Sequence, residues 1–292
     1  MTFLDTIYDE FSSATNMVDN EIDTLSAAAI IAKSNYRNLN IEKYERQIEY
    51  FAETLENSLP QNIGNVVPAN LVTLINGVFF NELNFKGDVN TYENPQNLYI
   101  NNVIDERKGI PISLALIYSE ICNRVGLDVQ VIGLPGHVIC RYNYYSDKNT
   151  TTKSTLLIDV FNNGRVISER DCNVIIKNTF GAKKDLLPHY LSSLTSRQIL
   201  MRILLNLKTT YLRQGNDEDA LRIIQLKLSM FYWDLDEIRD RGMIYERLGQ
   251  NELAIQDLQQ YVAHRSEARD IDMVKKVLKS LQIHSPNFKD LN

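Results

Sequence analysis

The segment "ERKGIPISLALIYSEICNRVG", Glu106–Gly126, decides the fold of this 292-residue chain. Its apolar residues recur at helical spacing, and Pro111 stands where proline favours the first turn of a helix. Beyond it, the runs "VQVIGL", "HVICRYNYY" and "TLLIDVF" are short, rich in β-branched and aromatic residues, and separated by turn residues. That is the pattern of β-strands. The sequence therefore predicts a buried helix followed by an antiparallel sheet.

The segments on either side of this centre have a helical pattern. Up to about Leu59, apolar residues in "IDTLSAAAIIAKSNY" and "YERQIEYFAETLENSL" recur at helical spacing, and "NLVTLINGVFFNEL" has one apolar face. From about Ser196 we expect helices to the end of the chain. The predicted fold class is therefore α+β, with N-terminal helices before the sheet and an all-α region after it.

The C-terminal region contains an internal repeat. Three pairs of like residues are separated by 34 positions: Tyr211 and Tyr245, Gly215 and Gly249, Ala220 and Ala254. This period resembles the tetratricopeptide repeat, in which each helix pair must stack on a neighbour to bury its apolar face. We predict two repeats, 202–234 and 236–268, and a capping helix near 270–282; the alternative is an unrelated pair of helical hairpins. The small residue expected before the tyrosine is Gly242 in the second repeat, whereas the first repeat has Lys208 there.

The centre of the chain resembles the SirB1 family. The resemblance covers "NLYINNVIDERKGIPISLALIYSEICNRVGLDVQVIGLPGHVICRY" and "LLIDVFNNGRVISERDC", and the motifs Glu-Arg-x-Gly-Ile-Pro and Gly-Leu-Pro-Gly-His carry it. That family joins a transglutaminase-like core to C-terminal tetratricopeptide repeats. The resemblance implies a papain-like core in residues 1–195, with a central helix on an antiparallel sheet. The repeats would then occupy residues 196–292.

The resemblance also implies the layout of an active site. In active members of the wider superfamily, a cysteine opens the central helix, a histidine lies on the next strands, and an aspartate follows. A helix N-terminus stabilises a thiolate, and the aspartate orients the histidine that serves as base and acid. His137 and Asp159 fill the last two places, but Pro111 stands fifteen residues before Gly126, where the cysteine is expected. The site is therefore predicted to be vestigial, with His137 a structural partner of Asp159.

Four other residues are candidate nucleophiles. Ser113 lies two positions beyond the proline, about 200° around the helix, and its expected role is a local hydrogen bond to the backbone. Cys122 is expected to be a buried apolar thiol, and Cys140 to lie on the strand face opposite the histidine. Cys172 is expected near a helix start that would lower its pKa, but nothing in the sequence places it beside the histidine.

Composition and charge exclude several classes of function. The net charge of −6 argues against general nucleic-acid binding, which relies on clustered lysine and arginine. The three cysteines lack metal-ligand spacing and predict reduced thiols in a cytoplasmic protein; the SirB1 resemblance implies a protein of bacterial type. The start, "MTFLDTIYDEF", lacks the features of a signal peptide, and the longest apolar run, "AAAIIA", is too short to span a bilayer. We expect no cofactor, no metal and no membrane insertion.

The repeat region is predicted to hold a protein or peptide partner. In tetratricopeptide repeats, the first helix of each pair lines a concave groove. The groove positions of this chain include four arginines: Arg202, Arg213, Arg239 and Arg247. Such a face favours an acidic peptide or a C-terminal carboxylate; the alternative is a solvated or covered charged face. The expected function is a non-catalytic interaction, assembly or regulatory factor. The alternative is a weak hydrolase or amide-processing enzyme using Ser113, His137 and Asp159.

Overall fold

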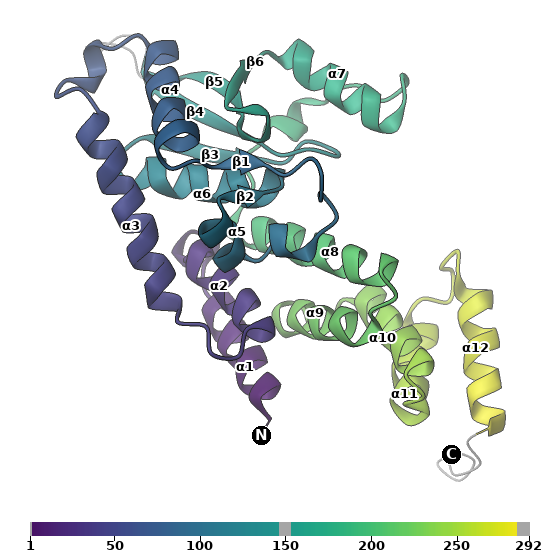
Figure 1. Cartoon of the computed structure of the whole chain (residues 1–292). Coiled ribbons are helices and arrows are strands. Elements are labelled where there is room, and N and C mark those ends of the chain that lie inside the picture. The colour runs from purple at the N-terminus through teal and green to yellow at the C-terminus, as the bar shows by residue number, and fades with distance from the viewer. Residues whose placement is uncertain (1, 146–152, 285–292) are drawn as a thin grey trace. The chain divides into compact units, whose positions relative to one another are not determined.

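The structure, a computed structural model, describes residues 2–145 and 153–284 (Figure 1). The chain forms two compact units, Met17–Ile203, and Met1–Asn16 together with Leu204–Asn292. We call them the core unit and the repeat unit. Helix α8, Ser196–Arg213, contains the end of the first and the beginning of the second. By contacts, the division along the chain falls between Ile203 and Leu204, and the first sixteen residues group with the repeats.

Helices precede the sheet in the core unit. They are α2 (Thr24–Asn35), α3 (Ile41–Ser58), α4 (Pro68–Asn76), α5 (Ile100–Glu106) and α6 (Pro111–Arg124). The side chains of Asp23 and Asn40 cap α2 and α3 by accepting backbone hydrogen bonds. Proline occupies the first turn of α4 and of α6, where it loses no helical hydrogen bond. Helix α6 is buried along most of its length and packs against both α3 and the sheet, so it is the central helix.

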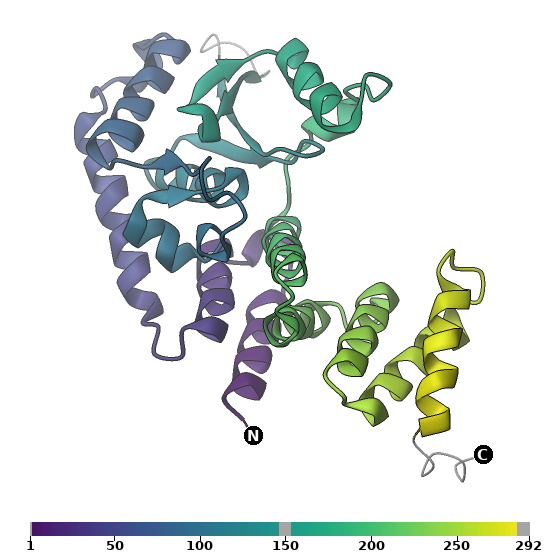
Figure 2. The same ribbon diagram turned by 45° about the vertical axis from the view of Figure 1, so that its right-hand side comes forward.

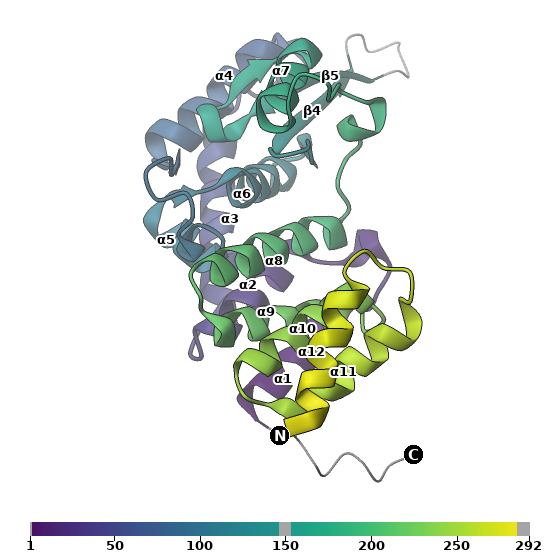
Figure 3. The same ribbon diagram turned by 90° about the vertical axis from the view of Figure 1, so that its right-hand side faces the viewer.

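The sheet of the core unit is antiparallel, with the strand order β3-β4-β5-β6. Its strands are β3 (Asp128–Ile132), β4 (Ile139–Tyr145), β5 (Lys153–Asp159) and β6 (Arg165–Ile167). A short parallel pair joins β1 (Lys86–Gly87) to β2 (Lys108–Gly109). One face of the four-stranded sheet lies on α6, and the other packs against α7, Glu169–Phe180 (Figure 3). Leu157 and Ile139 belong to that second face, where they cluster with Cys172 of α7.

The described residues of the repeat unit form helices and turns. Besides the last part of α8, its helices are α1 (Phe3–Thr15), α9 (Asp217–Met230), α10 (Leu235–Arg247), α11 (Asn251–His264) and α12 (Ile271–His284). Each helix from α9 to α12 packs on the next, and α1 packs on α9 (Figure 2). The turns after α8 and α10 use Gly215 and Gly249, whose φ angles of 67° and 72° favour glycine.

The two repeats differ at the position that holds Gly242 in one and Lys208 in the other. A Cβ on Gly242 would lie 2.8 Å from Leu258 Cδ2, so α10 and α11 approach too closely for any larger residue. Lys208 is buried, and its Nζ lies 2.7 Å from Glu237 and 2.5 Å from Asp240. The first repeat therefore replaces a close helix contact with a buried ion pair between α8 and α10.

Candidate functional site around His137 and Asp159

The loop that leads into α6 is built around Gly109 and Ser113. A Cβ on Gly109 would lie 2.6 Å from Ser113 Oγ and 2.9 Å from Val103 Cγ1, so only glycine fits. The Ser113 hydroxyl accepts a hydrogen bond from the Ile110 N–H (3.1 Å) and donates one to the Asn97 carbonyl oxygen (2.6 Å). The serine is fully buried. Its hydroxyl is thus used in hydrogen bonds to backbone groups at the start of the central helix.

A turn from Gly133 to Gly136 leads into the histidine. Gly136 has a φ of 74°, which favours glycine. Arg202 of α8 donates from Nη2 to the carbonyl oxygens of Leu134 (2.6 Å) and His137 (3.1 Å). A Cβ on Gly133 would lie 2.6 Å from Arg202 Nη1. Gly133 therefore makes room for the arginine, whose hydrogen bonds hold the turn.

His137 and Asp159 form a hydrogen-bonded pair at the end of β5. His137 Nε2 lies 2.9 Å from Asp159 Oδ1, and the two side chains are 11% and 5% exposed. Asn162 donates from Nδ2 to Asp159 Oδ2 at 2.8 Å. Burial alone would raise the pKa of the Asp159 carboxyl, but the hydrogen bonds and charge of His137 and the bonds from Asn162 hold that pKa below its usual value. The carboxylate therefore stays ionised and fixes the imidazole ring.

This geometry supplies the histidine and aspartate of a Cys-His-Asp site. Because Asp159 holds Nε2, Nδ1 is the ring nitrogen through which His137 would exchange a proton with a third group. Phe161 packs against the imidazole edge-on, with ring centroids 6.3 Å apart. The helix that would carry the nucleophile begins with Pro111. Among the described residues, the hydrogen bonds of the Ser113 hydroxyl go to backbone groups and none goes to the histidine.

The three cysteines are free thiols in buried positions. Cys140 Sγ lies 3.6 Å from a carbonyl oxygen of α6. Burial raises the pKa of the Cys122 and Cys140 thiols well above the usual value and raises that of Cys172 to about 11. The prediction that a helix start lowers the pKa of Cys172 is therefore wrong. Burial dominates there, and the nearby carboxylates of Asp171 and Glu169 add to the effect.

A cavity of about 330 Å³ opens beside the aspartate. Asp159 and Asn162 line one part of it, and Ile167 and Val174 line another. The cavity is large enough for a side chain or a small polar ligand, and the two carboxyl groups that line it, Asp159 and Asp171, both have pKa values lowered by their hydrogen bonds.

Arg107 of the Glu-Arg-x-Gly-Ile-Pro motif is a structural residue of the loop before α6. Its guanidinium carbon lies 4.4 Å from the ring centroid of Phe51 and 5.1 Å from that of Phe85. Its backbone is left-handed, with a φ of 55°, and its side chain donates to the Ile104 carbonyl oxygen. The Glu-Arg-x-Gly-Ile-Pro motif therefore fixes the α5–α6 loop through an arginine stacked on two phenylalanines.

Two of the arginines predicted to line a partner groove are paired with acids of the repeat unit. Arg239 lies 2.6 Å from Asp240 and 2.7 Å from Asp270, which precedes α12. Arg247 binds Asp217 through two hydrogen bonds of 2.6 and 2.8 Å. These bonds neutralise both cations, so the structure lends no support to a basic groove for an acidic partner.

The other two predicted groove arginines have different surroundings. Arg202 belongs to the core unit, where its guanidinium lies on backbone carbonyls beside His137. Arg213, at the end of α8, also interacts within the chain. Sequence spacing alone assigned all four arginines to one face, and the structure places Arg202 at the histidine turn instead.

Two structural observations bear on metals and membranes. Within residues 2–145 and 153–284, no group of three or more histidine, cysteine, aspartate or glutamate side chains is arranged to hold a metal ion. No helix in the same ranges combines the length and apolarity needed to cross a membrane.

Comparison with known proteins shows which families the two regions of the chain match. Residues 42–205 match the transglutaminase-like superfamily, and residues 207–279 match the tetratricopeptide repeat. A UPF0162 protein of Xylella fastidiosa is 27% identical over 260 residues, which are 88% of this chain and 89% of that protein. Protein SirB1 of Salmonella typhimurium is 26% identical over 204 residues, 70% of this chain and 73% of its own length. F-box only protein 21 of Mus musculus is 26% identical over 179 residues, 60% of this chain and 28% of that protein. The α+β core, the repeats and these matches confirm the predicted resemblance: the chain belongs to the transglutaminase-like superfamily, as a SirB1-family protein with C-terminal tetratricopeptide repeats.

Proposed function

We propose that this chain is a non-catalytic protein-interaction factor: a transglutaminase-like core that retains a His-Asp pair without a nucleophile, joined to repeats that hold a protein partner. The observation that carries the proposal is the start of α6. Pro111 occupies the first helical position, and the hydroxyl of Ser113, two positions further on, is buried and donates to the Asn97 carbonyl oxygen. An acyl-transfer reaction needs a nucleophile within hydrogen-bond reach of its base.

The repeat region supports the second half of the proposal. Helix pairs of this kind stack into a surface that binds other proteins more often than it performs chemistry. We also propose that the protein works in the cytoplasm, because its three thiols are free and buried, as in reducing compartments.

A specific observation keeps an enzymatic function as the second candidate. His137 and Asp159 have the spacing and the ionised carboxylate of a working acid–base pair. In this alternative, a weak hydrolase or amide-processing enzyme would use Ser113 as nucleophile, which requires the loop of Gly109 to open and release the hydroxyl from the backbone.

Two assays separate these candidates. Amide hydrolysis and amine incorporation into peptide glutamine are measured with the full chain and with the variants His137→Ala and Ser113→Ala. We expect the wild-type rate to equal the background and both variants to leave it unchanged. A rate above background that both variants abolish would establish the enzyme.

A thiol count with iodoacetamide at pH 8 adds an independent readout. We expect no labelling of the folded chain and three labelled cysteines after denaturation, because burial raises the pKa of every thiol.

The interaction itself is tested by affinity purification with chemical crosslinking of the full chain. We expect crosslinks from a recovered protein to concentrate on the repeat unit, from Leu204 of α8 to α12. Crosslinks confined to the core unit would contradict the assignment of partner binding to the repeats.

A further inference from the structure

A polar cavity of about 470 Å³ lies within the core unit, between α6, the start of α2, β3 and the segment that leads into α8. The residues that line it include Glu120, whose side chain is half-buried, and the hydroxyl groups of Thr24, Ser119 and Ser196. A volume of this size lies within the range of small-molecule sites. The cavity can therefore admit a small polar ligand.

The hydroxyl groups of this cavity offer hydrogen-bond acceptors to a ligand. Thr24 donates its hydroxyl hydrogen to Ser196 Oγ (2.8 Å), and Ser196 donates to the Ile22 carbonyl oxygen (3.4 Å). Ser119 donates to the Leu116 carbonyl oxygen (2.9 Å). Because a hydroxyl has one hydrogen and two acceptor lone pairs, the positions that remain on these oxygens can only accept. A ligand that suits these walls has to supply hydrogen-bond donors.

Glu120 is a carboxyl group of this cavity that lacks a partner. Within residues 2–145 and 153–284, its side chain makes no hydrogen bond and no ion pair. Burial and the negative charge of Asp23 raise the pKa of Glu120, and the charge of Arg124 opposes them. A half-buried carboxylate without a counter-ion is costly. A cation brought by a ligand would remove that cost.

The other charged groups that line the cavity already have partners. Asp23 caps α2 and accepts hydrogen bonds from the N–H (2.9 Å) and the hydroxyl (2.8 Å) of Ser26. Arg124 Nη1 lies 2.6 Å from Glu49 Oε2. Because Glu49 offsets the charge of Arg124, the carboxylates of Asp23 and Glu120 leave the cavity with a negative charge.

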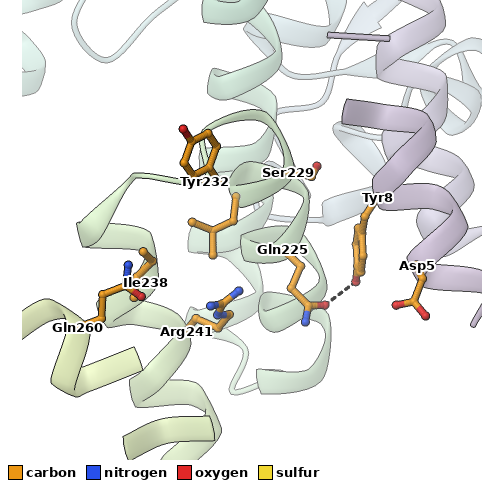
Figure 4. A pocket seen from close by; sticks show the side chains of 9 residues that line it. Asp5, Tyr8, Gln225, Ser229, Tyr232, Ile238, Arg241 and Gln260 are labelled. Carbon is orange, nitrogen blue, oxygen red and sulfur yellow. Dashed lines mark hydrogen bonds between the residues drawn. The ribbon is translucent and has the colours of Figure 1, made fainter. Parts of the chain in front are cut away.

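A second cavity, of about 390 Å³ in the repeat unit, provides a contrast (Figure 4). There the Tyr8 hydroxyl donates to Gln225 Oε1 at 2.6 Å. Arg241, on the same lining, binds Asp257 through two hydrogen bonds of 2.7 and 2.8 Å. These polar groups are satisfied within the chain, whereas the carboxyl group of Glu120 is left to a ligand.

We propose that the core-unit cavity binds a primary ammonium group on a short alkyl stem, with Glu120 as its counter-ion and the hydroxyl oxygens as further acceptors. An ammonium group has three donors and no acceptor, which matches walls whose hydroxyl hydrogens are already used. The apolar lining residues Leu116 and Val131 suit the alkyl stem. A free amine and a lysine side chain of another protein share this chemistry. The site does not depend on the interaction function proposed for the repeats.

The experiment titrates small probes into the full chain and measures their affinities by ligand-detected NMR and calorimetry. The probe n-butylamine carries the shared chemistry, putrescine represents free amines, and Nα-acetyl-lysine methylamide represents a lysine side chain of another protein. Butyrate has a similar stem with the opposite charge. We expect n-butylamine to bind and butyrate not to bind. The tighter binder of putrescine and the lysine derivative identifies the source of the ammonium group.

Glu120→Gln keeps the shape of the side chain and removes its charge. We expect it to weaken n-butylamine binding about tenfold, because one charge-assisted hydrogen bond is lost. The variant should fold, since it removes a half-buried charge whose burial is unfavourable, and urea titration checks this. Glu53→Gln removes an exposed glutamate from α3 of the same unit and is the matched control. It should leave the affinity unchanged.

Ser193→Phe tests the position of the site without changing its charge. Ser193 is exposed and lines the cavity, so a phenyl ring at this position takes up space that the ligand needs. We expect n-butylamine binding to fall about tenfold or more. Ser192→Phe places the same ring on the neighbouring exposed residue, which is not part of the lining. This control should bind as the wild type does.

The pH dependence of binding provides a further readout. An ammonium group binds the ionised form of Glu120, so protonation of this carboxyl competes with the ligand. Because the pKa of Glu120 is raised, the affinity should fall on acidification before an ordinary glutamate is protonated. The other charged groups that face Glu120, Asp23 and Arg124, are also present in Glu120→Gln. We therefore expect this fall to be absent from the variant.

Three outcomes would overturn the ammonium site. The first is binding of n-butylamine to Glu120→Gln as tight as to the wild type, and the second is tighter binding of butyrate than of n-butylamine. The third is the absence of binding by every probe at millimolar concentration. Each of these results leaves the interaction function standing, because crosslinking of a partner to the repeat unit tests that function separately.

Discussion

The two units of the chain treat buried charge in opposite ways. In the repeat unit, Lys208, Lys227 and Glu237 are all buried and satisfy one another across α8, α9 and α10. In the core unit, His137 and Asp159 form a buried hydrogen-bonded pair, and Arg202 lies on carbonyl oxygens; within the described part of the chain no carboxylate is bonded to Arg202. Each buried charge of the repeat unit has a partner of opposite charge, and removing one partner would leave the other unpaired. His137, in contrast, is held through one ring nitrogen, and its other nitrogen could still exchange a proton.

This difference explains why the two units suggest different functions. In the function proposed above, the core unit keeps the histidine and aspartate of an active site without its nucleophile, and the His137–Asp159 hydrogen bond links β5 to the turn before β4. In the repeat unit, the buried charged side chains form ion pairs with one another, and some aromatic rings are exposed to solvent. The predictions that follow test whether buried charge is structural in both units.

The largest effect is expected for Lys208→Met. Removing this cation leaves the buried carboxylate of Glu237 with one partner in place of two, and breaking a buried ion network typically costs about 3 kcal/mol or more. The free energy of unfolding is measured by urea titration followed by circular dichroism. Lys279→Met, an exposed position on α12, is the matched control and should change stability by less than about 0.5 kcal/mol. Equal losses in the two variants would show that the network does not stabilise the repeats.

A smaller effect is expected for Gly109→Ala in the core unit. The added Cβ meets Ser113 Oγ at 2.6 Å and Val103 Cγ1 at 2.9 Å, and overpacking of this kind costs about 1–3 kcal/mol. Gly77→Ala is the control, because no atom lies within 4 Å of its Cβ position and its backbone is helical. That control is expected to stabilise the chain by up to about 1 kcal/mol. A neutral Gly109→Ala would mean that the loop before α6 opens easily, which would favour the enzymatic alternative.

Much of the fold is readable from local patterns because periodicity and turn chemistry are local properties. The change from helical to strand spacing after Gly126 placed the sheet, and the repeat of Tyr211 at Tyr245 placed the helix pairs. The His-Asp pair followed from the family motifs. In each case the residues that carry the information lie close together or repeat at a fixed period.

The unpredicted part depends on contacts between distant segments. Arg202 reaches carbonyls 65 and 68 positions earlier in the chain, and helical spacing alone assigned it to a groove. Burial of Cys172 also escaped prediction, since the apolar side of α7 is defined by strands that precede it. Spacing gives the direction of a side chain from its own element but not what it meets there.

A pH-dependent effect is expected for Asp159→Asn. The pKa of Asp159 is lowered in the folded state, so this group adds stability above the unfolded pKa of about 3.9, and that stability is lost as the pH falls through the lower folded pKa. At pH 7 the variant should lose about 1 kcal/mol, the worth of a charge-assisted hydrogen bond to His137. Urea titrations at pH 7 and near pH 3 measure the difference, which should shrink at the lower pH. A loss that is the same at both values would rule out the charge of Asp159 as its source.

The smallest effect is expected at the exposed pair of Arg247 and Asp217. Its two hydrogen bonds are as short as those of the buried network, but the side chains are 42% and 21% exposed, so water replaces much of what the pair provides. A double-mutant cycle of Arg247→Ala and Asp217→Ala should give a coupling of about 0.5 kcal/mol that falls at 1 M salt. A coupling energy as large as the stability loss expected for Lys208→Met would show that hydrogen-bond geometry, and not burial, determines the strength of these ion pairs. Any difference between the Arg247–Asp217 pair and the Lys208 network would then come from the number of acidic partners that each cation contacts.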